Sequence, residues 1–463
     1  MTEKYVKWRW QKIKTKLDAT VKLRILRDRS TLDIFNDVHG DFSGDRTVDE
    51  AVDLNRLHIC LHKQSFTRRV AVVITVLTAA KLLTPLTEIE APQVTIEDGL
   101  ITSIESRGAL AVPEGAQHLD FPDATLVPGY FDVHIHGAMG HNAMEGTDEA
   151  FDAIGKFLSS CGVAAYLPTT VTAPIDMTLR ALEGMAQQIE RAKEASGNLS
   201  TGAKPLGIHL EGPFLSHSKR GVQPSEYLQL PSIELLQRFW EASRGHVVLM
   251  TVAPELPGAI ALIQEAVRLG IRVSLGHSNA TTPEAEAGVA AGAVSATHTF
   301  NAMRPLDHRE PGLLGVVLDE LHLYAELICD GIHVDPLLVR LFHKAKTPDR
   351  GILVTDAIAA TGMPDGVYKL GTMNVTVANG KCMFEGKLAG SVLTMDRAVR
   401  NFVKFTKASY GVAAHYASAN PAHMTGFGET YGELAPGRKA DITVLTPAGE
   451  VRSTLLNGQV FSG

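Results

Sequence analysis

The chain has 463 residues, which is enough for a barrel with a small second domain. Its 45% hydrophobic and 21% charged residues and formal net charge of −7 give no overall attraction to nucleic acid or to an anionic membrane. No run approaches the roughly 18 apolar residues of a membrane span. The four cysteines form no CxxC pair and predict reduced thiols in a cytoplasmic protein; they are Cys60, Cys161, Cys329 and Cys382.

Residues 1–69 differ from the rest of the chain in charge. They hold 15 Lys and Arg against 10 Asp and Glu, a net charge of +5. The opening MTEKYVKWRWQKIKTK includes Trp8 and Trp10 and lacks the apolar core of a secretory signal. One interpretation is a basic amphipathic helix that lies on a membrane or a partner. The interpretation we favour is an appended extension, partly disordered or upstream of the true start of translation.

Two all-β segments are expected to flank a parallel barrel. Residues 70–127 alternate apolar and polar side chains around Gly, Pro and Asp turns, which is typical of short antiparallel strands. Within 128–366, helical stretches alternate with apolar runs of strand length, and this rhythm predicts a (β/α) barrel. Further on, we expect strands at the edge of the sandwich or barrel (367–393), a helical segment that closes the barrel (394–425) and the last part of a small β-sandwich (426–463).

Imidazoles and carboxylates lie where the predicted barrel strands end. In a parallel barrel all the carboxyl ends open on one face, so residues far apart in sequence converge there. A single histidine after a strand is more often structural, but recurrence at strand after strand indicates a metal site. The residues are His134, His136, His209, Glu211, His277, His298, His333 and Asp356.

His134 and His136 flank Ile135, so on a strand both imidazoles face the same side, as two ligands of one ion would. Asp356 ends the last barrel strand. It is either the N-cap of a following helix or a general base beside a metal-activated water.

Several motifs together resemble one enzyme family. PGYFDVHIHG, HLEGPFLSHSKRGVQP, LGHSNA, THTFNAMRPLDHREPGLLG, ICDGIHVDP, LVTDAIAATG and LAGSVLTMDRAVRN occur in the order and with the approximate spacing of the N-acetylglucosamine-6-phosphate deacetylases of the amidohydrolase superfamily. The resemblance covers roughly residues 74–460. It implies an α/β fold: a distorted (β/α)8 TIM-like metal-dependent hydrolase barrel, with a small β-sandwich formed from the N- and C-terminal flanks.

The resemblance also assigns the metal ligands. It implies that Glu211, His277 and His298 bind the principal divalent ion, and that His134 and His136 add a second, so that each subunit holds one or two ions. Zn²⁺ suits these ligands, while Fe²⁺, Mn²⁺ and Co²⁺ are compatible. Asp356 matches the catalytic aspartate. The implied reaction is hydrolysis of N-acetylglucosamine 6-phosphate to glucosamine 6-phosphate and acetate, in amino-sugar catabolism.

The substrate residues follow from the same resemblance. Asn301 and the backbone of Ala302 would contact the phosphate, and Arg309 would reach it from the neighbouring subunit of a homodimer. On the sequence alone, a surface ion pair with Glu310 or Asp307 is the favoured explanation of Arg309. His333 would bind the hexose. The remaining pocket residues are Val222, Gln223, Asp330, Gly331, Ile332, Leu388, Ala389 and Gly390.

Gln223 departs from those family members that carry a histidine in this region to contact the acetyl group. Three alternatives to the deacetylase stay open: the same chemistry on the galactosamine epimer, a cyclic amidase or deaminase of the superfamily, and a non-catalytic relative. The intact set of metal ligands argues against the last of these.

Overall fold

The computed structural model describes residues 73–84, 87–195 and 202–461. The basic segment of residues 1–69 and its tryptophans therefore lie outside the described residues, as does Cys60. Cys161, Cys329 and Cys382 are free cysteines. Among the helices described, none is both long and apolar enough to cross a membrane.

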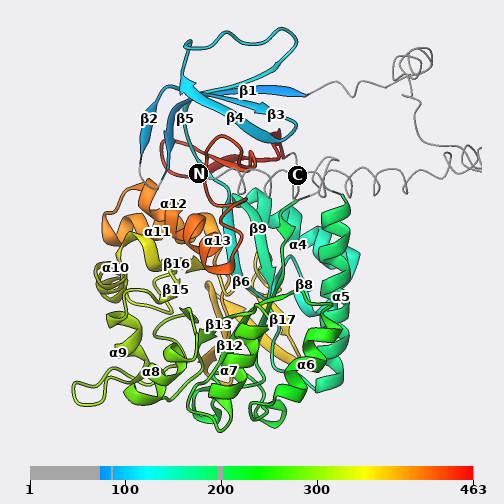
Figure 1. Ribbon diagram of the computed structural model, residues 1–463, viewed down its shortest axis with the longest axis vertical. Helices are drawn as coiled ribbons and strands as arrows, with labels where there is room; N and C mark the ends of the chain where they lie inside the picture. The colour runs from blue at the N-terminus through cyan, green and yellow to red at the C-terminus, as the bar shows by residue number, and fades with distance from the viewer. Residues whose placement is uncertain (1–72, 85–86, 196–201, 462–463) are drawn as a thin grey trace, which may run out of the picture. The chain divides into compact units, whose positions relative to one another are not determined.

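The two ends of the described chain share one sheet, seen at one end of the barrel in Figure 1. Its order is β23-β22-β21-β5-β1-β3-β4, with β2 added to β1. β5 joins the two flanks because it pairs in parallel with β1 and antiparallel with β21. The strands are β1 Ile74–Leu83, β2 Glu88–Glu90, β3 Pro92–Glu97, β4 Leu100–Ser106, β5 Gln117–Pro128, β21 Ile442–Leu445, β22 Val451–Leu456 and β23 Gln459–Val460.

This sheet curls over its own core. An isolated bridge joins Leu100 to Lys439, so the start of β4 meets the segment that leads into β21. Leu77, Leu126 and Val444 are fully buried in the enclosed cluster. Their burial follows from the alternation of apolar and polar residues along the strands, which sends every second side chain inward. The expected sandwich of both flanks is confirmed.

The barrel consists of parallel strands in two sheets, β10-β9-β6 and β11 to β16. Parallel bridges Thr169–His209 and Ile135–Ala357 join the sheets and close the ring, while β14, with two residues, marks its distortion. The expected TIM-like barrel is thus confirmed. Its strands are β6 Tyr130–Ile135, β9 Val163–Pro168, β10 Lys204–Pro205, β11 Ile208–Glu211, β12 Val247–Val252, β13 Arg272–Leu275, β14 Ser295–Ala296, β15 Tyr324–Ile328 and β16 Gly351–Val354.

Helices surround the barrel strands (Figure 1). They form where apolar residues recur at helical spacing behind a capping residue, as in α6, where Ser232 accepts a hydrogen bond from Leu235 N and Leu236 and Phe239 are buried. The helices are α4 Asp148–Ser160, α5 Ile175–Glu194, α6 Ile233–Ala242, α7 Ala259–Arg268, α8 Thr282–Ala290, α9 Gly312–Asp319, α10 Pro336–Arg350, α11 Met395–Thr406, α12 Tyr410–Ala417 and α13 Ala419–Thr425. Shorter elements are β7 Gly137–Ala138, β8 His141–Asn142, η2 Ala143–Glu145, η3 His217–Lys219 and η4 Ser225–Tyr227.

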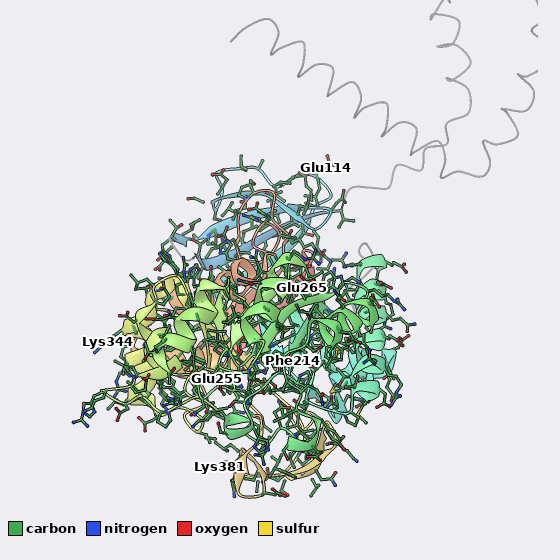
Figure 2. All side chains as sticks on the ribbon, turned by 60° about the horizontal axis from the view of Figure 1, so that its bottom comes forward. Glu114, Phe214, Glu255, Glu265, Lys344 and Lys381 are labelled. Carbon is green, nitrogen blue, oxygen red and sulfur yellow. The ribbon has the colours of Figure 1, made fainter. Side chains whose placement is uncertain are left out.

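The strands between residues 366 and 388 form a separate antiparallel sheet and do not pair with the sandwich. They are β17 Gly366–Leu370, β18 Met373–Ala378, β19 Lys381–Phe384 and β20 Lys387–Leu388. Their apolar side chains pack on Val171 and Ile358, which follow β9 and β16, so the sheet lies at the carboxyl ends of the barrel strands. In Figure 2, Lys381 of this sheet and Glu114 of the sandwich lie at opposite ends.

Candidate metal centre and active site

The metal-ligand candidates converge at one end of the barrel. They lie at the carboxyl ends of five parallel strands, and all are nearly inaccessible to solvent. The barrel topology accounts for the convergence, since the carboxyl ends of its strands open together. The residues are His134 and His136 on and after β6, Glu211 at the end of β11, His277 after β13, His298 after β14, and Asp356 after β16.

Glu211 lies between two sets of imidazoles. Its Oε1 is 3.1 Å from His277 Nε2 and 3.2 Å from His298 Nε2, and we call these three residues the primary ligand group. Oε1 is also 3.5 Å from His134 Nε2, and Oε2 is 3.4 Å from His136 Nε2; with Glu211 these two histidines form the second ligand group. The ligand atoms within each group lie close enough for a shared cation.

Hydrogen bonds at Nδ1 aim His277 and His136 at this centre. His277 Nδ1 is 2.9 Å from the carbonyl oxygen of Lys219, and His136 Nδ1 is 3.3 Å from that of Thr169. A carbonyl only accepts, so each Nδ1 carries the proton and each Nε2 presents a lone pair to the centre. His277 Nε2 and His298 Nε2 are only 3.0 Å apart, an arrangement that a shared cation makes favourable. The donor set therefore fits divalent metal ions.

Asp356 borders the second ligand group. Its Oδ1 is 3.1 Å from His136 Nε2 and 3.6 Å from His134 Nε2. Burial by itself would raise the pKa of this carboxyl, but when His136 and His134 are protonated and hold no cation, their contact and positive charge lower the pKa to about 2. Asp356 heads no helix, so the N-cap interpretation does not apply to it.

Backbone strain concentrates at the site. His277, His298, Ala302 and Asp356 all have positive φ, between 27° and 50°. Non-glycine residues adopt this region at an energetic cost, which surrounding contacts must offset, and such residues cluster at functional sites. At Asp356 those contacts include the hydrogen bond from its amide to the carbonyl oxygen of His134, at 2.9 Å.

A cavity of about 150 Å³ opens on the metal-ligand candidates. Seven predicted substrate residues line it: Val222, Gln223, Asn301, Ala302, His333, Leu388 and Gly390. Sequence reasoning missed other lining residues, chiefly Leu370 and Met373 from the β17–β18 hairpin, because an apolar hairpin residue carries no signal of the surface on which it packs. Val171, Gly221 and Ile328 were missed as well.

The remaining predicted residues lie outside the lining of this cavity. Asp330 accepts a hydrogen bond from the Nδ1–H of His333 at 2.7 Å and so orients that ring. This contact raises the pKa of His333 against the opposing effect of burial. Arg309 is exposed and its own amide donates to Asp307. Gly331, Ile332 and Ala389 do not line the cavity either.

Gln223 and His209 have contacts that the sequence did not reveal. Gln223 Oε1 accepts from the amide of Thr172 at 2.8 Å, and its Nε2 donates to Glu211 Oε2 at 2.9 Å. The glutamine side chain thus holds the carboxylate that both ligand groups share. His209 lies inside the barrel rather than in either group, with Nε2 2.8 Å from Thr251 Oγ1.

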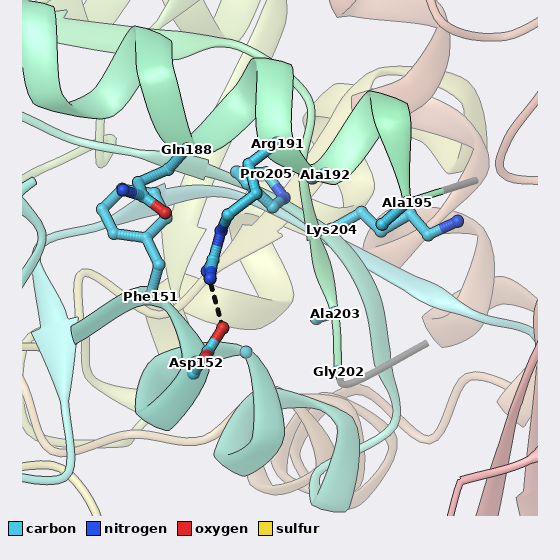
Figure 3. Close-up of a pocket in the computed structure, with 11 residues that line it drawn as sticks. Phe151, Asp152, Gln188, Arg191, Ala192, Ala195, Gly202, Ala203, Lys204 and Pro205 are labelled. Atoms are coloured by element: carbon cyan, nitrogen blue, oxygen red, sulfur yellow. Dashed lines mark hydrogen bonds and ion pairs between the residues drawn. The ribbon is translucent and has the colours of Figure 1, made fainter. Parts of the chain in front are cut away.

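Another cavity, of about 200 Å³, is lined by α4, α5 and residues 202–205, which include β10 (Figure 3). Arg191 and Asp152 form an ion pair there, 2.6 Å between Nη2 and Oδ1. The described residues that line it include no histidine and no glutamate. It therefore lacks the donors that distinguish the centre at the carboxyl ends of the strands.

Comparison with known proteins agrees with this geometry. Residues 125–461 match the Amidohydrolase family. The N-acetylglucosamine-6-phosphate deacetylase of Bacillus subtilis (strain 168) is 35% identical over 339 residues, which cover 73% of this chain and 85% of that protein. The chain belongs to the amidohydrolase family, in its N-acetylglucosamine-6-phosphate deacetylase branch. The N-acetylgalactosamine-6-phosphate deacetylase of Escherichia coli O157:H7 is 36% identical over 388 residues, covering 84% of this amidohydrolase and 99% of that enzyme.

Solved structures show the same architecture. A mutant N-acetyl-D-glucosamine-6-phosphate deacetylase from Mycobacterium smegmatis, in complex with N-acetyl-D-glucosamine-6-phosphate, superposes with a TM-score of 0.78 at 32% identity and covers 84% of this chain and 99% of its own. The N-acetylglucosamine-6-phosphate deacetylase of Thermotoga maritima gives a TM-score of 0.74 at 32% identity, covering 83% and 99%. The family is metal-dependent, and the clustered histidine and glutamate side chains of this amidohydrolase could hold such an ion.

Proposed function

We propose that this amidohydrolase removes the acetyl group of N-acetylglucosamine 6-phosphate, giving glucosamine 6-phosphate and acetate. The observation that carries the proposal is the primary ligand group, with Asp356 3.1 Å from His136 at the edge of a cavity large enough for part of a sugar. Named relatives with this specificity match most of the chain.

Hydrolysis of an acetamide needs activation of water and protonation of a poor leaving group. A divalent cation held by the two ligand groups supplies Lewis-acid chemistry, which polarises a carbonyl and acidifies water. Asp356 takes the proton of the attacking water on Oδ1 and then delivers it to the departing sugar nitrogen. The burial of Asp356 limits exchange of that proton with bulk solvent.

The cavity residues divide the recognition of the substrate. We assign phosphate binding to Asn301 and the amide of Ala302, and hexose binding to His333, because all three line the cavity and Asp330 orients His333. Leu388 and Gly390, with the β17–β18 hairpin, enclose the rest of the substrate. Arg309 is exposed and does not line the cavity of its own subunit. We propose that the protein is a homodimer in which Arg309 of each subunit binds the phosphate in the neighbouring site through two hydrogen bonds.

We further propose that zinc is the resident ion, with two ions per chain. Histidine and carboxylate ligands suit zinc, and two ligand groups share Glu211. Elemental analysis of protein purified without added metal identifies the ion and its stoichiometry. A cytoplasmic location is consistent with the three free cysteines of the described residues.

The first prediction concerns Asp356. The substitution Asp356→Asn removes the proton acceptor but keeps a similar shape, so kcat should fall by at least about 100-fold while metal content is unchanged. Steady-state kinetics on N-acetylglucosamine 6-phosphate and metal analysis of the same preparation provide the measurement. Near-normal turnover by the variant would refute the role given to Asp356.

The second prediction concerns the sugar epimer, since a galactosamine-specific relative matches 84% of this chain. We expect kcat/KM to be higher for N-acetylglucosamine 6-phosphate than for N-acetylgalactosamine 6-phosphate. Both substrates should be assayed with one enzyme preparation. Activity confined to the galacto substrate would replace the proposed specificity with that alternative.

A further inference from the structure

Glu326, in the middle of β15, is a carboxylate that the proposed chemistry does not use. Its side chain is fully buried in the barrel interior. A buried carboxylate costs several kcal/mol unless it is paired and hydrogen-bonded, so its presence in a barrel strand calls for a partner.

That partner is His134. Glu326 Oε2 lies 3.1 Å from His134 Nδ1 and 3.1 Å from the backbone nitrogen of His298. An ionised carboxylate only accepts, so both nitrogens donate and the Nδ1 of His134 carries the proton. The other nitrogen, Nε2, makes no hydrogen bond to any described residue and faces Glu211 and Asp356 at 3.5 and 3.6 Å.

Glu326 and His134 do not form a cation site of their own with the neighbouring His209. The three side chains lie close enough to suggest one. However, His209 has both ring nitrogens engaged, with Nδ1 3.1 Å from the carbonyl oxygen of Val133 and Nε2 2.8 Å from Thr251 Oγ1. Since His134 Nδ1 is also engaged, neither imidazole has a free lone pair on that side, and Glu326 acts through His134.

The partner of His134 differs in charge from those of the metal-ligand candidates His136 and His277. His136 and His277 donate to neutral backbone carbonyls, whereas His134 donates to a carboxylate. An anionic partner fixes the tautomer and makes the opposite nitrogen a stronger ligand, and loss of such a partner typically weakens metal binding by about 10- to 100-fold.

We propose that Glu326 is the positioning residue of the second ligand group: it fixes His134 with Nε2 toward the centre and adds negative charge that favours a second cation. This inference rests on the proposed function only in requiring a two-ion centre. It predicts that Glu326 sets the affinity for the second ion. The affinity of the primary ligand group should change little, because Glu326 contacts that group only at the backbone amide of His298.

The experiment is a zinc titration of chelated protein by calorimetry. Wild type should bind two equivalents, and His134→Ala should bind one. Glu326→Leu removes the acceptor and should raise the dissociation constant of the second ion by about 100-fold or more. Glu326→Gln keeps a carbonyl acceptor without the charge and should raise the dissociation constant of the second ion by about 10-fold. The tighter ion should be retained in every case.

A matched control is Asp441→Asn, which changes a carboxylate that accepts from the amide of Asn457 at 2.7 Å in the sandwich; it should bind zinc as wild type does. If Glu326→Leu fails to fold, the zinc titration of Glu326→Gln tests the inference. Two zinc ions bound by Glu326→Gln with the wild-type dissociation constants would overturn the inference, and so would a wild type that binds one. Absence of deacetylation by a two-zinc enzyme would instead contradict the proposed function alone.

Discussion

At the residue scale, a few hydrogen bonds decide which way each functional group points. Gln223 is an instance, because both ends of its amide are occupied: Thr172 donates to it and it donates to Glu211. The sequence presented this residue as a contact for substrate. Its position in the fold indicates that the side chain also holds the carboxylate on which both ligand groups depend.

The third prediction is that Gln223→Ala lowers the affinity for zinc by about 10-fold or more, because Glu211 loses the donor that orients its Oε2. Dissociation constants from metal-buffered titration provide the measurement. Gln188→Ala is the matched control, since Gln188 is also a buried glutamine and hydrogen-bonds Asp148 away from the centre. Unchanged zinc affinity with a raised KM would show that Gln223 serves only the substrate.

At the scale of elements, helix ends need partners for their last carbonyl groups. Lys346 of α10 supplies them to α9. Its Nζ donates to the carbonyl oxygens of Val317 and Glu320 at 2.8 and 2.6 Å. The side chain is only 1% exposed, and burial lowers its pKa to about 8.

The fourth prediction is that Lys346→Met lowers the free energy of unfolding by about 1–3 kcal/mol, because two buried carbonyls lose their donor. In the wild type, the unfolded chain keeps the lysine proton up to a pKa of about 10.4, whereas the folded chain releases it near pH 8. The unfolded state therefore binds more protons between these values, and the stability of wild type relative to the variant should rise with pH there.

Urea unfolding at pH 7 and pH 9.5 measures both effects. Lys344→Met is the control, since Lys344 is exposed on the same helix (Figure 2) and should change stability little at either pH. A variant at Lys346 as stable as that control would show that the two carbonyls find other partners.

At the scale of the whole molecule, the site needs contributions from separate parts of the fold. The barrel brings the metal ligands together, and the β17–β20 sheet covers the substrate side with Leu370 and Met373. Arg309 does not reach the cavity of its own subunit. We propose that the positive charge at the phosphate comes from Arg309 of a second copy of the chain.

The fifth prediction uses two inactive variants. Arg309→Ala lacks the arginine and Asp356→Asn lacks the base, so neither homodimer should be active. If Arg309 acts across the interface, mixed dimers hold one intact site each, and random exchange of subunits should restore about a quarter of wild-type activity. Assays before and after mixing test this, with light scattering to confirm the dimer. If mixing restores no activity, Arg309 does not act in the active site of the neighbouring subunit.

Much of this protein follows from local sequence. Strand and helix patterns predicted the barrel because apolar periodicity reflects which face of an element is buried. The positions of His134, His136, Glu211 and Asp356 were visible because parallel strands all end on one face. What remained hidden were contacts between distant segments, such as Glu326 with His134 and Gln223 with Glu211.

Local sequence was enough to predict the elements, the end of the barrel that carries the chemistry and the donor atoms available there. The fold was needed to show how those donors divide into two ligand groups around Glu211 and which nitrogen of His134 faces the centre. It was also needed to show that residues 366–388 cover the site without joining the sandwich. The reason is physical: periodicity is a property of one element, whereas hydrogen bonds and sheet pairing depend on distances between elements that no local pattern encodes.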